Sequence, residues 1–227
     1  MTSLRDLDLS YNFFTSLPNG LLSSLSRLKS VILIDNLLQG VISGAIGNLT
    51  SLIILDMSSN QLEGNIPRSL GKLCKLKTID LSYNKLGEVI TELFRCFSHC
   101  MLFGLESMSL QKNYLGCQFP NEPDQFKNLT YLSLANNSIY GPIPMSIERL
   151  SSSAMLDLSY NHLTGVLPQS PGQLAKLETL DLSNNRLNGT LLESLGQLAK
   201  LETLDLSYNH LNGTLPKSLG KFGMLTV

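Results

Sequence analysis

Residues 52–73 read LIILDMSSNQLEGNIPRSLGKL, and a close copy, LETLDLSYNHLNGTLPKSLGKF, occupies residues 201–222. Each stretch centres on an asparagine, Asn60 or Asn209, with apolar residues eight, five and three positions before it and two after it. The same frame recurs through the whole chain. A fixed period of roughly 20–30 residues with a recurring polar residue is typical of a solenoid of stacked coils.

The framed asparagines, called here the ladder asparagines, follow one another every 24 residues, with one interval of 29. Of the 27 framing positions that precede them, 26 are apolar, the exception being Ser153, and all nine that follow are apolar. Nine coils are therefore predicted, with the long repeat at 85–113. The ladder is Asn12, Asn36, Asn60, Asn84, Asn113, Asn137, Asn161, Asn185 and Asn209.

The frame predicts how each coil folds. Residues three and five positions before the ladder asparagine alternate inward, as a short strand requires, so each coil adds one strand to a parallel sheet. The chain then turns sharply. An asparagine amide both donates and accepts hydrogen bonds, so it can satisfy backbone groups of neighbouring coils in that turn. The second half of the repeat reads Gly-x-Ile/Leu-Pro, as at Gly64–Pro67, and predicts a tight backbone followed by a small helical turn.

The repeat resembles the plant-specific class of leucine-rich repeat, whose pattern LxxLDLSxNxLxGxIPxxLGxL is matched nearly whole at 52–73 and 201–222. The resemblance covers the full chain. It implies an α/β repeat fold, a right-handed solenoid of about nine coils with a parallel sheet on its concave face. More narrowly, the stretch from GKLCKLKTIDLSYNKL through ITELFRCFSHC to GLESMSLQKN is similar to ectodomains of plant receptor-like proteins in the fungal-elicitor receptor group.

One array is expected over residues 1–227. The frame starts at Leu4, close to Met1, and the chain stops at Val227, just after Leu225 opens a tenth repeat. Solenoids normally carry capping units with a polar outer face. We therefore expect an array that is uncapped at both ends: an interior piece of a longer array, a truncated gene product or an abridged gene model. The sequence holds no signal peptide and no apolar run long enough to span a membrane, so no membrane contact by this segment is expected.

Composition argues against several classes of function. The net charge is −1 and the charged fraction is 15%, and no basic run suggests nucleic acid. His99, His162 and His210 share no spacing that would bring them together. An aspartate stands four positions before the ladder asparagine in six coils, and we interpret this column as a solvated acidic ridge that belongs to the repeat. No enzyme, catalytic residue, cofactor or metal site is expected.

The cysteines gather around the long repeat. They are Cys74, Cys96, Cys100 and Cys117. Their spacing does not favour zinc, so we interpret them as one or two structural disulfides of an extracellular protein. Three complete pairings are possible, and the residues alone do not choose among them. The family resemblance implies that Cys74 pairs with Cys100.

Candidate ligand contacts are sought on the concave face, defined here as the strand side chains that point away from the core, because solenoids commonly bind through it. Coils two and three place isoleucines there, and a contiguous apolar patch often marks an interaction site. Coils five and six replace the acidic column with polar and aromatic side chains that suit a peptide, protein or glycan. The alternative is that these residues differ from the repeat through sequence drift and have no function. The candidates are Ile32, Ile34, Ile53, Ile54, Glu106, Ser109, Gln111, Lys112, Tyr131 and Ser133.

Five asparagines begin N-x-S/T triplets and are candidates for glycosylation if the chain enters the secretory path. They are Asn48, Asn128, Asn136, Asn188 and Asn212.

The resemblance implies a ligand-recognition array of a plant cell-surface receptor-like protein, extracellular or in the apoplast and active in defence perception. Its partners would be a peptide, protein or glycan ligand and, in the full-length protein, a co-receptor kinase, because this chain has no kinase motifs. One alternative is a secreted inhibitor of a microbial cell-wall hydrolase, similar to polygalacturonase-inhibiting proteins. The cysteine-bearing long repeat argues against it. Another alternative is a truncated product without independent activity.

Overall fold

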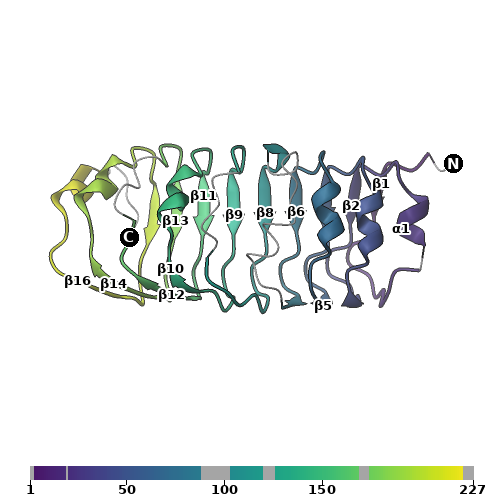
Figure 1. The fold of residues 1–227 in the computed structure, drawn as a ribbon, viewed down its shortest axis with the longest axis horizontal. Helices are drawn as coiled ribbons and strands as arrows, with labels where there is room; N and C mark the ends of the chain where they lie inside the picture. The colour runs from purple at the N-terminus through teal and green to yellow at the C-terminus, as the bar shows by residue number, and fades with distance from the viewer. Residues whose placement is uncertain (1–2, 19, 88–102, 120–125, 169–173, 222–227) are drawn as a thin grey trace. The chain divides into compact units, whose positions relative to one another are not determined.

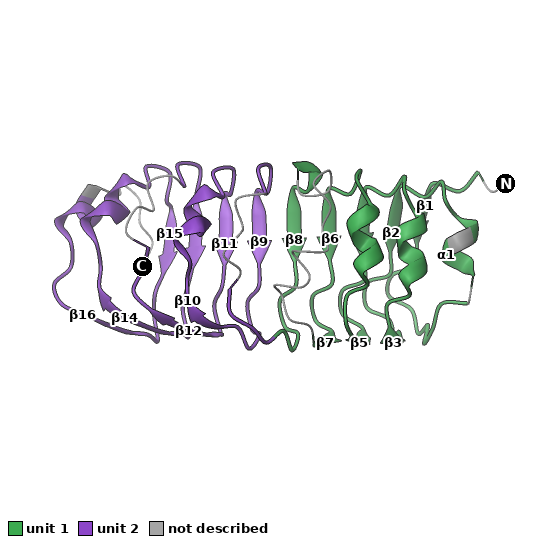
Figure 2. Ribbon diagram, in the orientation of Figure 1, with its two compact units in different colours: residues 1–115 green, residues 116–227 purple. Residues whose placement is uncertain are grey.

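The computed structural model describes residues 3–18, 20–87, 103–119, 126–168 and 174–221. It divides into two compact units, residues 1–115 and 116–227 (Figure 2). Each unit is a stack of coils that are built in the same way (Figure 1). That the two units form one continuous array stays a prediction.

Unit 1 has a main parallel sheet to which successive coils each contribute one short strand. Within a strand such as Ile54–Asp56, the central Leu55 is buried and its neighbours face outward, as the inward frame predicts. The strands are β1 (Asp6–Asp8), β2 (Ser30–Ile32), β4 (Ile54–Asp56), β6 (Thr78–Asp80) and β8 (Ser107–Ser109). The helices are α1 (Leu21–Ser24), η1 (Gly44–Asn48) and η2 (Arg68–Lys72), of which η1 and η2 are 3₁₀ turns.

Unit 2 repeats this arrangement, and its main sheet is again parallel. The strands are β9 (Tyr131–Ser133), β11 (Met155–Asp157), β13 (Thr179–Asp181) and β15 (Thr203–Asp205). The 3₁₀ helices are η4 (Met145–Arg149), η6 (Glu193–Gln197) and η7 (Lys217–Lys221). The predicted class of fold, a leucine-rich-repeat solenoid with parallel strands, is confirmed.

Each unit also has a second parallel sheet, which the sequence analysis did not predict. It forms after the ladder turn, where the repeat reads Gly-x-Ile/Leu-Pro. In β5 the last residue, Gly64, has a φ of 73°, and a Cβ there would lie 3.0 Å from a Val41 methyl group of the preceding coil. The strands are β3 (Gln39–Val41), β5 (Gln61–Gly64) and β7 (Lys85–Leu86) in unit 1, and β10 (Tyr140–Pro142), β12 (His162–Gly165), β14 (Arg186–Thr190) and β16 (His210–Asn212) in unit 2.

The ladder asparagines connect each coil to the coil before it, which confirms the role expected of their amides. The Asn60 Nδ2 donates to the Leu33 carbonyl at 2.9 Å, and its Oδ1 accepts from the Leu38 N–H at 3.0 Å. Asn161 makes the equivalent bonds in unit 2. Both amides are buried, so the same bonds that join the coils also satisfy backbone groups that water cannot reach. The pattern is shared by Asn36, Asn60, Asn84, Asn113, Asn161, Asn185 and Asn209.

The residue before every ladder asparagine adopts the left-handed conformation, with φ between 49° and 54°. Such a φ is uncommon outside glycine and is enriched several-fold in asparagine and aspartate. Here it starts the turn that ends the strand. Tyrosine occupies this position in four coils, and the sequence frame gave no sign of the conformation. The residues are Tyr11, Asp35, Ser59, Tyr83, Lys112, Asn136, Tyr160, Asn184 and Tyr208.

The long repeat leaves the main sheet in register. Ile79 of β6 pairs with Met108 of β8, an offset of 29 residues, whereas the other pairs of unit 1 are offset by 24. The five extra residues belong to the long repeat at 85–113, and residues 88–102 of that repeat lie outside the described residues. The insertion therefore leaves the strand pairing unchanged.

Ser153 takes the place of an inward leucine in its coil. The structure adds a compensating contact, since the fully buried hydroxyl donates to the Leu129 carbonyl of the preceding coil at 3.0 Å. The apolar burial of a leucine is still lost, but no unsatisfied hydroxyl is buried in its place.

Cys74 is disulfide-bonded and exposed at the surface of unit 1. Cys100, its predicted partner, and Cys96 lie outside the described residues, so the pairing stays a prediction. Cys117 is a buried thiol.

Replacing a ladder asparagine tests its role directly. Asn161→Ala is expected to lower the free energy of unfolding by roughly 2–4 kcal/mol, because the buried Leu134 carbonyl and Ile139 N–H lose their partner. Asn12→Ala is the matched control: the Asn12 side chain is exposed and donates only within its own coil. Urea unfolding followed by far-ultraviolet circular dichroism measures both. Equal losses would contradict the ladder account.

Candidate ligand-binding face

The aspartate column is held by the turn that follows each strand. In all six coils the aspartate Oδ1 accepts the backbone N–H of the serine two residues later at 2.9–3.0 Å. At Asp8, Asp56 and Asp157 the serine hydroxyl donates to the same oxygen. A carboxylate that caps its own turn has a structural task. This finding sharpens the interpretation of the column as part of the repeat.

The pKa values of Asp80, Asp181 and Asp8 depart from the ordinary value of an aspartate, each for a local reason. Burial raises the pKa of Asp80, and the negative charge of Asp56 on the neighbouring strand adds to the effect. Burial likewise raises the pKa of Asp181, which lies between Asp157 and Asp205. The pKa of Asp8, a fully exposed group, is lowered by the hydrogen bonds from Ser10.

Ile32 and Ile54, two of the isoleucine candidates of unit 1, form a short apolar line across adjacent strands. Ile32 of β2 stands opposite Asp56 of β4, and Ile54 is opposite Ser30, so the two isoleucines are diagonal neighbours. Ile54 is 37% exposed, whereas Ile32, Ile34 and Ile53 are half-buried. Because Ile32 also pairs with Asp8 of β1, the apolar line is bounded by carboxylates on both sides.

Coil five gathers the charged candidates of unit 1. The Glu106 carboxylate forms an ion pair with the Lys77 ammonium of the preceding coil at 2.6 Å, and both side chains are about half exposed. Gln111 is half-buried and Lys112 is exposed. Ser109, by contrast, is only 3% exposed, so it offers a ligand almost no surface.

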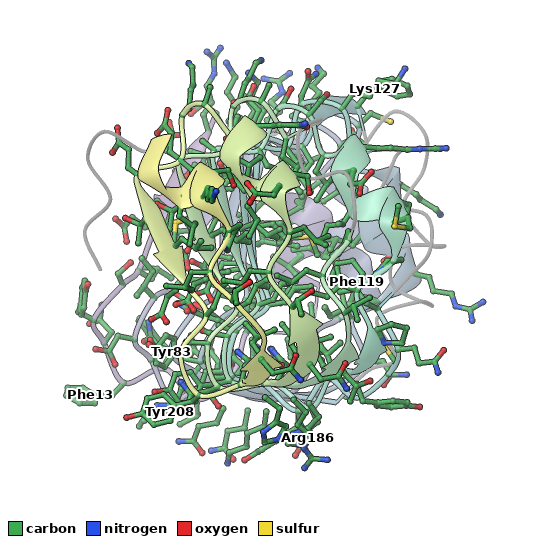
Figure 3. The ribbon with its side chains drawn as sticks, turned by 90° about the vertical axis from the view of Figure 1, so that its left-hand side faces the viewer. Phe13, Tyr83, Phe119, Lys127, Arg186 and Tyr208 are labelled. Carbon is green, nitrogen blue, oxygen red and sulfur yellow. The ribbon has the colours of Figure 1, made fainter. Side chains whose placement is uncertain are left out.

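A contact that the sequence analysis missed joins Lys112 to the preceding coil. Its ammonium lies 4.9 Å from the centre of the Tyr83 ring, a cation–π interaction. Both residues hold the left-handed position before their ladder asparagines, so their side chains leave the turn side by side. Tyr83 is 46% exposed, and its side chain is labelled in Figure 3. Only the stacking of coils reveals this pair.

The two candidates of unit 2 differ in accessibility. Tyr131, at the start of β9, is half-buried and faces Met155 of β11 in the register. Ser133 is fully buried, and its hydroxyl donates to the Asp157 carboxylate at 3.3 Å. Tyr131 is therefore the accessible member, and Ser133 serves to hold the neighbouring aspartate. The binding roles of all ten candidates stay predictions.

All five glycosylation candidates are exposed. Asn188 and Asn212 occupy equivalent outward positions in β14 and β16, Asn136 lies in a ladder turn, and Asn48 ends η1. Exposure is what a glycan acceptor requires, and occupancy itself stays a prediction.

The described residues hold no group of three or more side chains suited to binding a metal ion. None of their helices has both the length and the apolar character that crossing a bilayer requires.

Comparison with known families identifies the class of protein. Leucine rich repeat profiles match residues 2–62, 26–86 and 153–211, and a second leucine-rich-repeat profile matches 75–102 and 128–150. The chain belongs to the leucine-rich-repeat family. A search of curated protein sequences returned no match.

Solved structures give a narrower likeness. A TDR receptor structure is 32% identical with a TM-score of 0.91, covering 98% of this chain and 38% of that one. The Arabidopsis receptor kinase HAESA, solved with the peptide hormone IDA and the co-receptor SERK1, is 32% identical with a TM-score of 0.88. It covers 97% of this chain and 36% of that one. A plant ice-binding protein is 28% identical with a TM-score of 0.75, covering 94% and 67%. The chain thus resembles plant receptor ectodomains and spans well under half of their length.

The raised pKa of Asp80 and the lowered pKa of Asp8 predict effects of pH on stability that are opposite in sign. Asp80→Asn is expected to raise the free energy of unfolding at pH 7, because the wild-type carboxylate is destabilised by burial while asparagine keeps the oxygen that accepts from Ser82. The gain should shrink as the pH falls through the raised folded-state pKa toward 3.8. Thermal unfolding at a series of pH values measures the difference between variant and wild type.

Asp8→Asn is the matched comparison. Because its folded-state pKa is lowered, the wild-type carboxylate contributes stability above pH 3.8 that is lost as the pH falls through the lowered pKa. The variant should therefore be less stable than wild type near neutrality and equal to it in strong acid. The same sign for both variants would refute the assigned causes.

Proposed function

We propose that this chain is part of the extracellular ligand-recognition array of a plant receptor-like protein and that a peptide or protein ligand binds along the concave face. The observation that carries the proposal is the combination of a regular scaffold with irregular outward residues. Core positions repeat from coil to coil, whereas outward positions such as Ile54 in its strand and Gln111 just after its strand depart from the repeat.

The kind of ligand is supported by the structures that this chain resembles. HAESA was solved with the peptide hormone IDA, RGFR1 with RGF2, and GASSHO1/SCHENGEN3 with CASPARIAN STRIP INTEGRITY FACTOR 2. The first two are 32% and 30% identical to this chain and the third is 29% identical. These likenesses favour a peptide over a glycan as the ligand.

The accessible contacts lie in two places in unit 1. Ile54 and Ile32 offer an apolar line between carboxylates. The end of coil five offers Gln111 and the Lys112 ammonium stacked on the Tyr83 ring. A ligand with aliphatic side chains and a hydrogen-bonding or acidic group suits this combination. In unit 2 the corresponding surface includes Tyr131.

The finer parts of the proposal concern the whole protein. We place it in the fungal-elicitor receptor group, in defence perception, on the outer side of the plasma membrane or in the apoplast. Its exposed N-x-S/T asparagines would carry glycans. Signalling would pass through a co-receptor kinase, as HAESA was solved with the co-receptor SERK1. The stretch from GKLCKLKTIDLSYNKL to GLESMSLQKN supports the group assignment.

A binding experiment tests the proposed face. The purified chain is immobilised and exposed to low-molecular-mass peptides from plant apoplastic fluid and from fungal culture filtrate, and retained peptides are sequenced, synthesised and titrated by calorimetry. Lys112→Ala and the double variant Ile32→Ser/Ile34→Ser are each expected to weaken binding by about tenfold, a loss of roughly 1.4 kcal/mol. Lys72→Ala, an exposed change in η2 away from the strands, is the control and should leave affinity unchanged.

The possible outcomes separate the proposal from its alternatives. Equal affinity of all variants would place the ligand elsewhere. Retention of peptides from fungal filtrate alone would support the defence role, and retention from the plant alone would oppose it. Inhibition of a fungal polygalacturonase by the purified chain, without peptide binding, would favour the hydrolase-inhibitor alternative.

A further inference from the structure

Unit 1 contains a cavity of about 180 Å³ on the side of the coils away from the concave face. It opens between the second halves of coils one and two and reaches down to Met57 and Leu62 in coil three. Both of these floor residues are nearly inaccessible to water. The volume is somewhat larger than the roughly 150 Å³ apolar cavity known to admit benzene.

The cavity exists because coil one departs from the repeat. Six positions after the ladder asparagine, coils two and three place Ile42 and Ile66 inward, but coil one has Pro18, whose ring fills less space. The backbone of coil one follows β3 only as far as Thr15, whose carbonyl accepts from the Gln39 N–H at 3.1 Å. Beyond that point no strand of coil one pairs with β3 in the described residues.

The loss of this strand leaves Val41 uncovered. Its side chain, at the mouth of the cavity, is 70% exposed. Deeper in, the walls are formed by Leu38 and Ile46, which are buried. Apolar walls and an apolar floor favour an occupant with a compact hydrocarbon body.

The polar side chains of the lining, those of Ser16, Gln39 and Ser43, are all exposed and stand near the rim. The Ser43 hydroxyl already accepts from the Ala45 N–H at 3.3 Å, while keeping its own donor. None of the described residues that line the cavity is ionisable, so a charged occupant would lose its hydration without gaining an ion pair.

We propose that this cavity binds a small uncharged molecule with a compact apolar body, such as an aromatic ring or a branched alkyl chain, and one hydroxyl or amide group directed at the rim. The site is separate from the concave face and does not depend on the receptor role proposed above. The apolar body lies against Met57, Leu62 and Ile46, and the polar group reaches Gln39 or Ser43.

Benzyl alcohol is the probe, with benzoate as its charged counterpart. In the full chain with labelled methyl groups, benzyl alcohol is expected to produce saturable changes in the NMR signals of Met57 and Ile46, and benzoate should bind at least about tenfold more weakly. Ala45→Leu fills the cavity from η1 and should weaken the binding of benzyl alcohol by about tenfold or more. Ala175→Leu, the same change at an exposed alanine of unit 2, should have no effect.

A second variant tests the site without changing a buried residue. Gln39→Ala changes an exposed side chain and should weaken the binding of benzyl alcohol more than the binding of benzene, which has no polar group. The proposal is overturned if benzyl alcohol gives no saturable change, if benzoate binds equally well, or if Ala45→Leu binds as wild type does. Failure here leaves the peptide-binding proposal untouched, because the variants and readouts do not overlap.

Discussion

The hydrogen bonds of the ladder asparagines are the constraint on which the rest of the structure depends. The chain must leave the strand by a sharp turn inside the core, where backbone groups have no strand partner and no water. The amide meets this need by donating to one carbonyl and accepting from one N–H of the preceding coil, as Asn60 does with Leu33 and Leu38. Each turn therefore becomes a connection between coils.

That connection explains the register of both sheets within each unit. The amide reaches backward to two points, one just before the preceding turn and one just after it. The end of the main strand and the start of the second strand are thus positioned by the same side chain. A 29-residue coil keeps its place because Asn113 still reaches Leu81 and Leu86. Extra residues are accommodated only in the part of the coil that the ladder does not hold.

The inward pattern, the main strands and the amide role could be predicted from the spacing alone, because core positions in a stacked repeat must agree from coil to coil. The second sheet could not, because Gly-x-Ile-Pro contains two residues that usually interrupt strands. In β5 the positive φ of Gly64 ends the strand rather than preventing it.

The candidate site was predictable only in part, for a related reason. Strand alternation places Ser109 and Ser133 outward, yet both are buried, because a short side chain is covered by its larger neighbours on adjacent strands. Sequence position predicts which face of the sheet a side chain points to, but not how far the neighbouring side chains cover it. The contact of Lys112 with Tyr83 was hidden because it joins residues 29 positions apart through a turn conformation that no motif announced.

In such a fold, the informative residues are those that break the repeat. The aspartate column recurs because each carboxylate caps its own turn, whereas Ile32 interrupts the column and gains an apolar surface. Pro18 interrupts the inward isoleucines and opens a cavity. Each coil contacts mainly its immediate neighbours, so a departure is felt over one or two coils and the array as a whole survives it. Binding surfaces can therefore diverge coil by coil, while the ladder that joins the coils stays the same.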